Sequence, residues 1–220
     1  MVGSPNRDRK AERREATRRE ILAAAWEVAH EGGLNSVTLR EIAARIGMRP
    51  PSLYSHFASK NAIYDAMFAQ AWDDLHAVLE KEIPAFPADP RGRVLALAST
   101  YFDFAVGDLE RHQLMDMPMV RDFTPSEEAY RSSLKCYGIM QSVLSEVGIH
   151  RQADLDLYTA VVGGLVNQQL ANDPHGERWR ALLPRALTLI ADDLGLPAQP
   201  RPPAEPRTAQ PHTRRRRNGT

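Results

Sequence analysis

The stretch TLREIAARIGMRPPSLYSHFASK, residues 38–60, decides how the chain folds, because it reads as two short helices separated by a glycine turn. Thr38 and Glu41 form the T-x-x-E pattern of a capping box, which begins a helix by satisfying its free amide hydrogens. Gly47 stands where the chain leaves that helix, and a residue without a Cβ enters the left-handed conformation there at low cost. Pro50 and Pro51 then suit the first turn of a second helix.

The second helix of this stretch has an inner and an outer face. We expect it to run from about Arg49 to Phe57, with Leu53 and Phe57, four residues apart, facing inward. The outer face then carries hydrogen-bonding groups, as a helix that reads base edges in the major groove requires. Two short helices joined in this way indicate a helix-turn-helix DNA-binding motif.

Amphipathic helices are expected on both sides of this stretch. Upstream, apolar residues at helical spacing predict a helix from Thr17 to His30, which two glycines end. Downstream, Ser59 is a suitable N-cap for a helix with a wide apolar face that continues to about Lys81. Three prolines in residues 83–90 then predict a loop.

The rest of the chain shows helical periodicity and no convincing strand pattern. Further helices are expected at about 91–110, 125–147, 152–172 and 176–194, with Pro184 as a kink in the last. We therefore predict an all-α fold, in which an N-terminal three-helix head is followed by a helical body.

Composition divides the chain into four parts. The two ends contain many charged residues or prolines and almost no large apolar side chains, so they cannot bury themselves. The expected parts are a basic flexible arm at 1–16, a helix-turn-helix domain at 17–65, a helical body at 66–195, and a disordered Pro/Arg-rich tail at 196–220.

Charge is segregated along the chain although the net charge is zero. Residues 1–70 hold eleven Lys and Arg against eight Asp and Glu, residues 71–195 hold eleven against nineteen, and residues 196–220 hold six against one. Both ends attract polyanions and the middle repels them, which would orient the chain on nucleic acid. Ordinary variation in surface charge is the alternative interpretation.

The composition also bears on the compartment. Cys136 is the only cysteine, so no disulfide forms within the chain, and a reducing cytosol suits it. No window approaches eighteen uninterrupted apolar residues, and the N-terminus lacks the apolar core of a signal peptide. We expect a cytoplasmic protein that does not enter a membrane.

Catalytic patterns are not evident in the sequence, which contains no G-x-S-x-G, H-E-x-x-H or G-x-x-x-x-G-K-[ST] motif. Asp73, Asp74 and His76 lie close together, but one histidine beside acids on a helix is more often a solvated face than a metal site. We expect no enzymatic activity, no cofactor and no metal.

Residues 47–60, GMRPPSLYSHFASK, resemble the turn and recognition helix of the tetracycline-repressor (TetR) family of bacterial transcription regulators. That family commonly reads G-[VM]-x-x-x-[ST]-L-Y-x-[HY]-F-x-[ST]-K there. The helix ending in Gly32-Gly33 and the segment V-T-L-R-E-I-A extend the resemblance to residues 15–65. Pro50 departs from the pattern, because the family often has a polar residue at that position, and the base sequence that is read therefore stays open.

The resemblance implies roles for individual residues of the motif. It places Thr38, Tyr54, His56 and Lys60 on DNA phosphates, and all four can donate hydrogen bonds to phosphate oxygens. It places Arg49, Pro51, Ser52 and Ser55 at base edges, where arginine can form two hydrogen bonds with guanine.

The resemblance further implies a homodimeric, ligand-responsive regulator, and we expect a repressor of a pseudo-palindromic operator in double-stranded DNA. Dimerisation would set two recognition helices about 34 to 36 Å or more apart. An apolar or aromatic small molecule in the body, residues 66–195, would release the DNA. The candidate effector-pocket residues are Trp72, Phe102, Met117, Tyr137, Met140, Tyr158 and Gln168, and the candidate dimer-interface residues are Val161, Gly164, Leu165, Leu183 and Leu187.

Two other classes remain open at this point. One is a ligand-independent DNA-binding regulator or architectural protein, whose body would be a solid helical core. The other is an enzyme built on a helical fold, which would require a catalytic acid, base or nucleophile grouped in a pocket.

Overall fold

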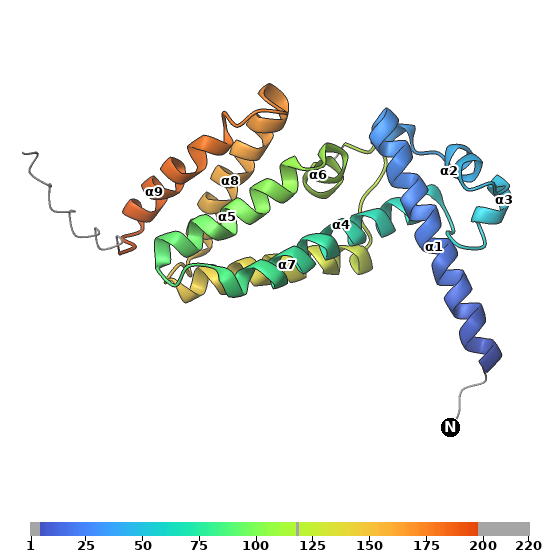
Figure 1. The fold of residues 1–220 in the computed structure, drawn as a ribbon, viewed down its shortest axis with the longest axis horizontal. Coiled ribbons are helices and arrows are strands. Elements are labelled where there is room, and N and C mark those ends of the chain that lie inside the picture. The colour runs from blue at the N-terminus through green and yellow to red at the C-terminus, as the bar shows by residue number, and fades with distance from the viewer. Residues whose placement is uncertain (1–4, 118, 198–220) are drawn as a thin grey trace, which may run out of the picture.

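A computed structural model describes residues 5–117 and 119–197, and within these ranges it contains helices and no strand. The predicted all-α fold class is confirmed. Figure 1 shows a small head at one end and a longer body of helices beside it. The head contains α1 (Pro5–Gly32), α2 (Leu39–Arg45) and α3 (Pro50–Leu53), and the body contains α4 (Lys60–Glu82), α5 (Pro90–Val106), α6 (Leu109–Asp116), α7 (Glu127–Glu146), α8 (Gln152–Asn172) and α9 (Leu183–Asp193).

Side-chain caps begin the helices that frame the head. The Thr38 hydroxyl oxygen accepts a hydrogen bond from the Glu41 amide at 3.1 Å, and the Ser59 oxygen accepts one from the Ala62 amide at 3.1 Å, as the sequence predicted for both. Gly47 ends α2 in the left-handed conformation with φ of 65°. These local signals fix the angle between the two helices of the motif.

Helix α4 belongs to two hydrophobic cores. Its N-terminal half supplies Tyr64 and Met67 to the core of the head, and its C-terminal half supplies Leu75 and Leu79 to the core of the body. In the body it packs mainly against α7. One continuous helix therefore connects the helix-turn-helix motif with the interior of the body.

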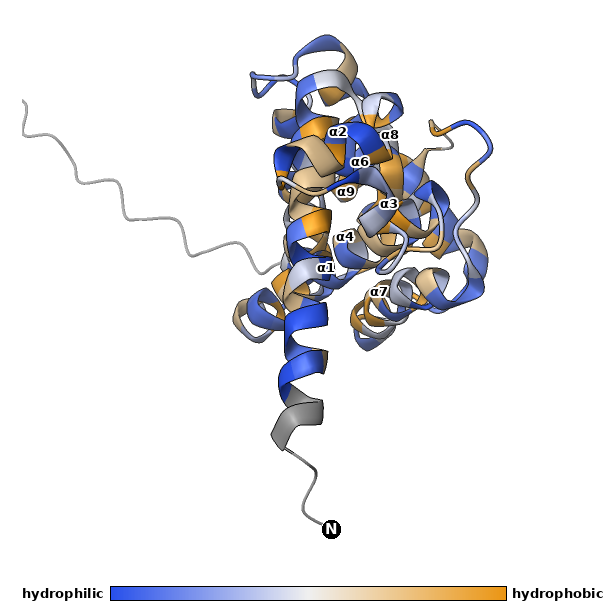
Figure 2. Ribbon diagram, turned by 90° about the vertical axis from the view of Figure 1, so that its right-hand side faces the viewer, coloured by the Kyte–Doolittle hydropathy of each residue, from blue (hydrophilic) through white to orange (hydrophobic). Residues whose placement is uncertain are grey.

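Helix α1 is longer than the sequence predicted, because it begins at Pro5 and not at Thr17. Where a flexible arm was expected at 1–16, the described part is a helix that extends beyond the packed head, and Figure 2 shows the coloured turns of this extension to be hydrophilic. Alanine, arginine and glutamate are good helix formers. Extension of an existing helix also avoids the cost of nucleation, so these residues need no core of their own.

Three further differences from the predicted helices have local causes. α3 ends at Leu53, and the chain continues to Phe57 in tighter turns. In these turns the amides of His56 and Phe57 both donate hydrogen bonds to the Leu53 carbonyl at 2.9 Å. An additional helix, α6, is capped at its N-terminus by Asp108, whose carboxylate oxygen accepts a hydrogen bond from the Arg111 amide at 2.9 Å. Pro184 lies in the first turn of α9 and begins that helix, so it does not kink it.

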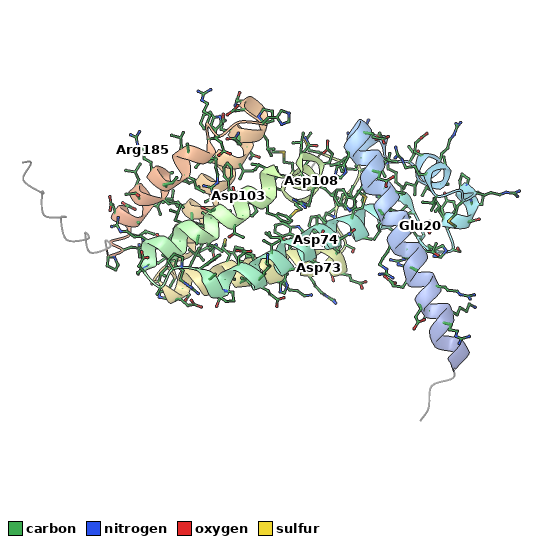
Figure 3. The ribbon with its side chains drawn as sticks, in the orientation of Figure 1. Glu20, Asp73, Asp74, Asp103, Asp108 and Arg185 are labelled. Carbon is green, nitrogen blue, oxygen red and sulfur yellow. The ribbon has the colours of Figure 1, made fainter. Side chains whose placement is uncertain are left out.

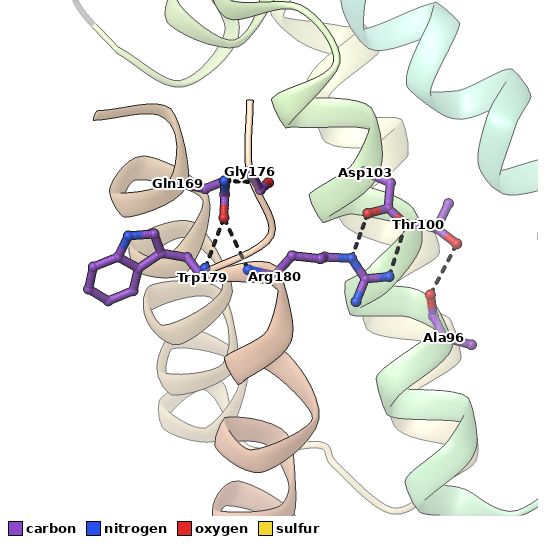
Figure 4. A network of polar contacts seen from close by, with 7 residues as sticks. All are labelled: Ala96, Thr100, Asp103, Gln169, Gly176, Trp179 and Arg180. Carbon is purple, nitrogen blue, oxygen red and sulfur yellow. Dashed lines mark hydrogen bonds and ion pairs between the residues drawn. The ribbon is translucent and has the colours of Figure 1, made fainter. Parts of the chain in front are cut away.

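A buried amide attaches α9 to the rest of the body (Figure 4). Gln169 of α8 accepts hydrogen bonds from the amides of Trp179 and Arg180 at 2.9 and 3.2 Å and donates to the Gly176 carbonyl at 2.8 Å. The Arg180 guanidinium also forms two hydrogen bonds with Asp103 of α5, at 2.6 and 3.0 Å. The 3-10 turn at Arg180–Leu182, which leads into α9, is therefore bonded to both α8 and α5.

The body continues slightly past the predicted boundary at residue 195. Leu196 is buried in the core of the body, and its carbonyl accepts a hydrogen bond from Arg91 at 2.7 Å. The rest of the predicted Pro/Arg-rich tail, residues 198–220, lies outside the described residues.

Candidate DNA interface and effector cavity

The recognition turn is built on two buried side chains. Leu53 and Phe57 are 0% and 3% exposed, as predicted, and they hold the segment against α1 and α4 in the core of the head. Arg49 caps α3 with its backbone, and the first two helical positions are Pro50 and Pro51. With the inner face anchored in this way, the opposite face of the turn is free to meet DNA.

Most of the predicted DNA-binding residues lie on that outer face. Tyr54 is 57% exposed, which is high for a large aromatic side chain. The Ser55 hydroxyl donates to the Ser52 carbonyl at 2.7 Å, so its lone pairs still point to solvent. The exposed members of the predicted set are Thr38, Arg49, Pro51, Ser52, Tyr54 and Ser55.

Two of the predicted phosphate contacts are less exposed than the others. His56 is half-buried, and its Nδ1 is enclosed without a hydrogen-bond partner among the described residues. Lys60 is also half-buried, with its ammonium nitrogen 5.1 Å from the centre of the Tyr64 ring. The ring restricts the direction of the ammonium group, which lies at the N-terminus of α4.

Two arginines of α1 hold the recognition turn in place, a role that the sequence did not predict: Arg14 belongs to the arm expected at 1–16, and Arg18 stands at the start of the helix expected from Thr17. Arg14 donates to the Ser55 carbonyl at 3.3 Å, and Arg18 donates to the His56 carbonyl. The Arg18 guanidinium carbon also lies 4.1 Å from the centre of the Phe57 ring. A signal was present in the sequence, because positions 14 and 18 continue the helical stripe of the buried Ile21 and Ala25.

A cavity of about 520 Å³ lies in the body, among α4, α5, α6, α7 and α8. Of the seven predicted pocket residues, Trp72, Tyr137, Met140 and Tyr158 line it. Phe102 does not line it and packs in the core of the body, and neither Met117 nor the exposed Gln168 belongs to the wall. The exposed side chains of Tyr130 and Leu134 on α7 also line it.

One part of the cavity wall is polar, and the sequence prediction missed it. Asp116 of α6 accepts a hydrogen bond from the Tyr101 hydroxyl at 3.0 Å and lies 3.2 Å from Nδ1 of His112. Nε2 of His112 lies 2.9 Å from Oδ1 of Asn167 on α8. Burial of the imidazole lowers the pKa of His112, but the hydrogen bonds with Asp116 and Asn167 outweigh this effect, so the pKa of His112 is raised overall.

Cys136 lies in the wall of the same cavity. Its thiol donates to the Trp72 carbonyl at 3.2 Å, and burial raises its pKa to about 11. The protonated thiol is therefore the stable form, and it acts as a small apolar side chain with a weak donor.

Several contacts join the body to the head besides α4. In the segment between α6 and α7, Val120 is buried in the core of the head, and the Phe123 ring lies 5.4 Å from that of Tyr64. Asn61 of α4 donates to the Asp122 carbonyl at 3.1 Å. Because α6 forms part of the cavity wall, a shift of this helix would be transmitted directly to the core of the head.

A second link joins the end of α1 to the start of α6. Nε2 of His30 lies 3.0 Å from a carboxylate oxygen of Asp108, and Glu110 brings a third atom that could bind a metal ion within 4.8 Å of both.

Asp73 and Asp74, the acidic residues considered in the sequence, lie on α4. Figure 3 shows them with Asp103 and Asp108 along the body.

The predicted dimer-interface residues fall into two groups. Gly164 is exposed on α8, and Val161 and Leu165 beside it are half-buried. Leu183 and Leu187, however, are 0% and 3% exposed and belong to the core of the same chain, so they offer no surface to a partner. The sequence showed that α9 has an apolar stripe but did not show which side faces the core. The large apolar residues exposed on α8, on α9 and on the turn before α9 are Leu157, Leu189 and Leu182.

No helix in the described part of the chain has the length and apolar character needed to cross a membrane.

An exposed, polar recognition turn on a three-helix head, joined by one helix to a body with a cavity open to solvent, defines a DNA-binding protein of the helix-turn-helix class with a separate helical domain. The comparisons agree with this class. Residues 21–67 match the model of the bacterial regulatory proteins of the tetR family. The N-terminal domain, residues 21–67, is therefore a DNA-binding domain of the tetR family of bacterial regulatory proteins.

Relatives with named roles match less than half of the chain. The HTH-type transcriptional activator FasR of Mycolicibacterium smegmatis is 32% identical over 102 residues, 46% of each chain. The HTH-type transcriptional repressor KstR2 of Rhodococcus jostii is 36% identical over 86 residues, which cover 39% of this chain and 42% of that protein. The chain thus matches less than half the length of these relatives, and their names include both an activator and a repressor.

The similarity in fold extends through the body. The crystal structure of the transcriptional regulator FadR from Bacillus subtilis in complex with stearoyl-CoA superposes with a TM-score of 0.63. The match covers 78% of this chain and 96% of that structure at 20% sequence identity, which is a likeness of fold.

Proposed function

We propose that this protein is a ligand-responsive transcriptional repressor. It binds a pseudo-palindromic operator in double-stranded DNA as a homodimer, and it leaves the operator when an apolar or aromatic small molecule occupies the cavity. The observation that carries the proposal is the course of α4, which is capped beside the recognition turn by Ser59 and lines the cavity with Phe68 and Trp72.

The DNA-binding part of the proposal rests on the division of the recognition turn into two faces. Leu53 and Phe57 fix the turn from inside, while Arg49, Ser52 and Ser55 are exposed on its outer side. The proposed base contacts belong to these exposed residues and to Pro51. The proposed phosphate contacts belong to Thr38, Tyr54, His56 and Lys60, of which Thr38 stands at the N-terminus of α2.

The homodimer is proposed on the exposed apolar side of α8 and α9. Leu189 is 63% exposed and Leu157 42% exposed, and Gly164 and Ala160 leave room on α8 for close approach of another helix. A glycine in the middle of a helix costs up to about 1 kcal/mol relative to alanine, and no side chain of the same chain fills the space beside Gly164. A second copy of the chain would supply that contact.

The ligand response is proposed because the cavity wall and the core of the head share structural elements. A ligand that contacts Met115 or Asp116 would displace α6, and the segment after α6 carries Val120 and Phe123 into the head. Ligand binding shifts the conformation only if the DNA-free state binds it more tightly. A cavity of about 520 Å³ argues against the alternative of a solid, ligand-independent body.

Selection of binding sites from random DNA tests the proposal. We expect the full chain to select an inverted repeat, and Arg49→Ala to lose preference at one position of each half-site while it retains the rest. Arg131, exposed on α7 of the body, provides a matched control, because Arg131→Ala removes the same charge outside the head. Selection of a single, non-repeated site, or equal loss on all sequences for Arg49→Ala, would contradict the proposal.

A further inference from the structure

The turns of α1 that precede Arg14 extend into solvent. Figures 1 and 2 show the described part of these turns beyond the packed head, with no other helix covering it. Arg9, Lys10 and Arg13 are exposed there, and none of their side chains forms a hydrogen bond or an ion pair with a described residue. Neither hydrophobic core includes a described residue of these turns. Packing within the chain therefore does not account for their sequence.

The charged side chains of α1 are sorted around the helix. Successive residues of an α-helix are rotated by about 100°, so residues four apart lie on one face. Lys10, Arg14 and Arg18 follow this spacing and form a stripe, which we call the basic stripe. Glu12 and Glu15 lie outside it, since they are rotated from Arg14 by about 160° and about 100°. Like charges four residues apart destabilise a helix, and a polyanion beside the basic stripe would remove this repulsion.

The basic stripe borders the recognition turn. Arg14 donates to the Ser55 carbonyl at 3.3 Å, and Arg18 donates to the His56 carbonyl. Ser55 is a proposed base contact and His56 a proposed phosphate contact, so the basic stripe lies on the side of the head where DNA would bind. Lys10 stands one turn before Arg14, about 6 Å further along the helix axis. Its ammonium group is therefore placed just beyond the edge of the recognition turn.

We infer, on the basis of the proposed DNA binding, that the basic stripe of α1 is a second DNA-binding surface, on which Lys10 contacts a backbone phosphate beside the bases that the recognition turn reads. Such a contact adds affinity and orients the head but carries no sequence information. Because Lys10 belongs to a helix that Arg14 and Arg18 attach to the turn, its position relative to the turn is fixed before DNA binds. A flexible arm would lose conformational freedom on binding, and this helix avoids most of that cost.

The salt dependence of binding to random-sequence DNA tests this inference without knowledge of the operator. The probe is a duplex of about 40 base pairs, and its affinity for the full chain is measured by fluorescence anisotropy over a series of salt concentrations. We expect Lys10→Ala to reduce the slope of log affinity against log salt by about one. The matched control is Arg19→Ala, which removes an exposed charge of the same helix outside the basic stripe and should leave the slope unchanged.

A second variant tests whether the helix itself is required. Ala16 is exposed, and Ala16→Pro keeps every charge but breaks the helix between Lys10 and the core of the head. We expect it to reduce the slope at least as much as Lys10→Ala. The unfolding midpoint of Lys10→Ala should equal that of the wild type, because Lys10 makes no contact whose loss would change the fold.

An unchanged slope for Lys10→Ala would show that the basic stripe is an ordinary solvated surface and would overturn the inference. An equal decrease for Arg19→Ala would do the same, because charge anywhere on α1 would then suffice. An unchanged slope for Ala16→Pro would assign the contact to a flexible arm and remove the role of the helix. The proposed function can fail separately, since a chain that selects no inverted repeat can still show the expected slopes on random DNA.

Discussion

The guanidinium of Arg18 on α1 lies over the Phe57 ring of the recognition turn, with its central carbon 4.1 Å from the ring centre, and donates to the carbonyl of His56. This basic side chain, near the start of the helix that the sequence predicts from Thr17, thus acts inside the protein. It positions the turn that carries the proposed base contacts.

We expect Arg18→Ala to lower the free energy of unfolding by about 2 kcal/mol, from the lost cation–π contact and the lost charge-assisted hydrogen bond. DNA affinity should fall on specific and random sequences alike, because the whole turn loses its support. Arg19→Ala is the matched control, since Arg19 is exposed on the same helix. Thermal unfolding and fluorescence anisotropy measure both effects, and an unchanged unfolding midpoint would show that Arg18 has no structural role.

Lys60 offers a test of phosphate contact that does not depend on knowing the operator. Its ammonium lies over the Tyr64 ring at 5.1 Å, at the N-terminus of α4 beside the recognition turn. We expect Lys60→Ala to weaken binding about equally on all sequences and to reduce the slope of log affinity against log salt by about one. The control is Lys135→Ala on the exposed side of α7, and an unchanged slope for Lys60→Ala would remove the assignment.

Local rules of sequence predicted the parts of the site that depend on a few neighbouring residues. The caps at Thr38 and Ser59, the turn at Gly47 and the inward side chains of Leu53 and Phe57 all follow from short-range chemistry. These signals need no knowledge of the rest of the chain.

Features that depend on tertiary packing were not predictable in the same way. The polar cluster of the cavity brings together Tyr101, His112, Asp116 and Asn167 from three helices, and nothing in their separate surroundings marks them as neighbours. The position of Leu187 in the core also depended on how α9 docks, because an apolar stripe can face either the body or another chain.

The pH dependence of stability should report on His112. Its pKa is raised in the folded protein, so the folded state binds more protons than the unfolded state between the two pKa values. The stabilisation is full below the unfolded pKa of about 6.5 and is lost as the pH rises through the raised folded value.

Urea unfolding over a pH series measures this decline in stability. The wild type should show the decline and His112→Gln should not. The control His76→Gln, which removes a half-buried histidine paired with Glu80, should show the same decline as the wild type. An equal slope in His112→Gln and wild type would contradict the prediction.

Two glycines provide a matched test of the homodimer. Gly164 on α8 and Gly138 on α7 are both exposed in the middle of a helix, and a Cβ added at either would meet no atom within 4 Å in the single chain. Either site should therefore accept arginine without loss of the fold, and arginine is a better helix former than glycine. The two variants differ only in whether the position lies on the proposed α8 and α9 interface.

We expect Gly164→Arg to weaken dimerisation tenfold or more, about 1.4 kcal/mol, because it inserts a bulky charge between closely packed helices. Gly138→Arg should dimerise as the wild type does. Sedimentation velocity at several concentrations measures the difference, and an intact dimer in Gly164→Arg, or a wild type that sediments as a monomer, would refute the assigned interface.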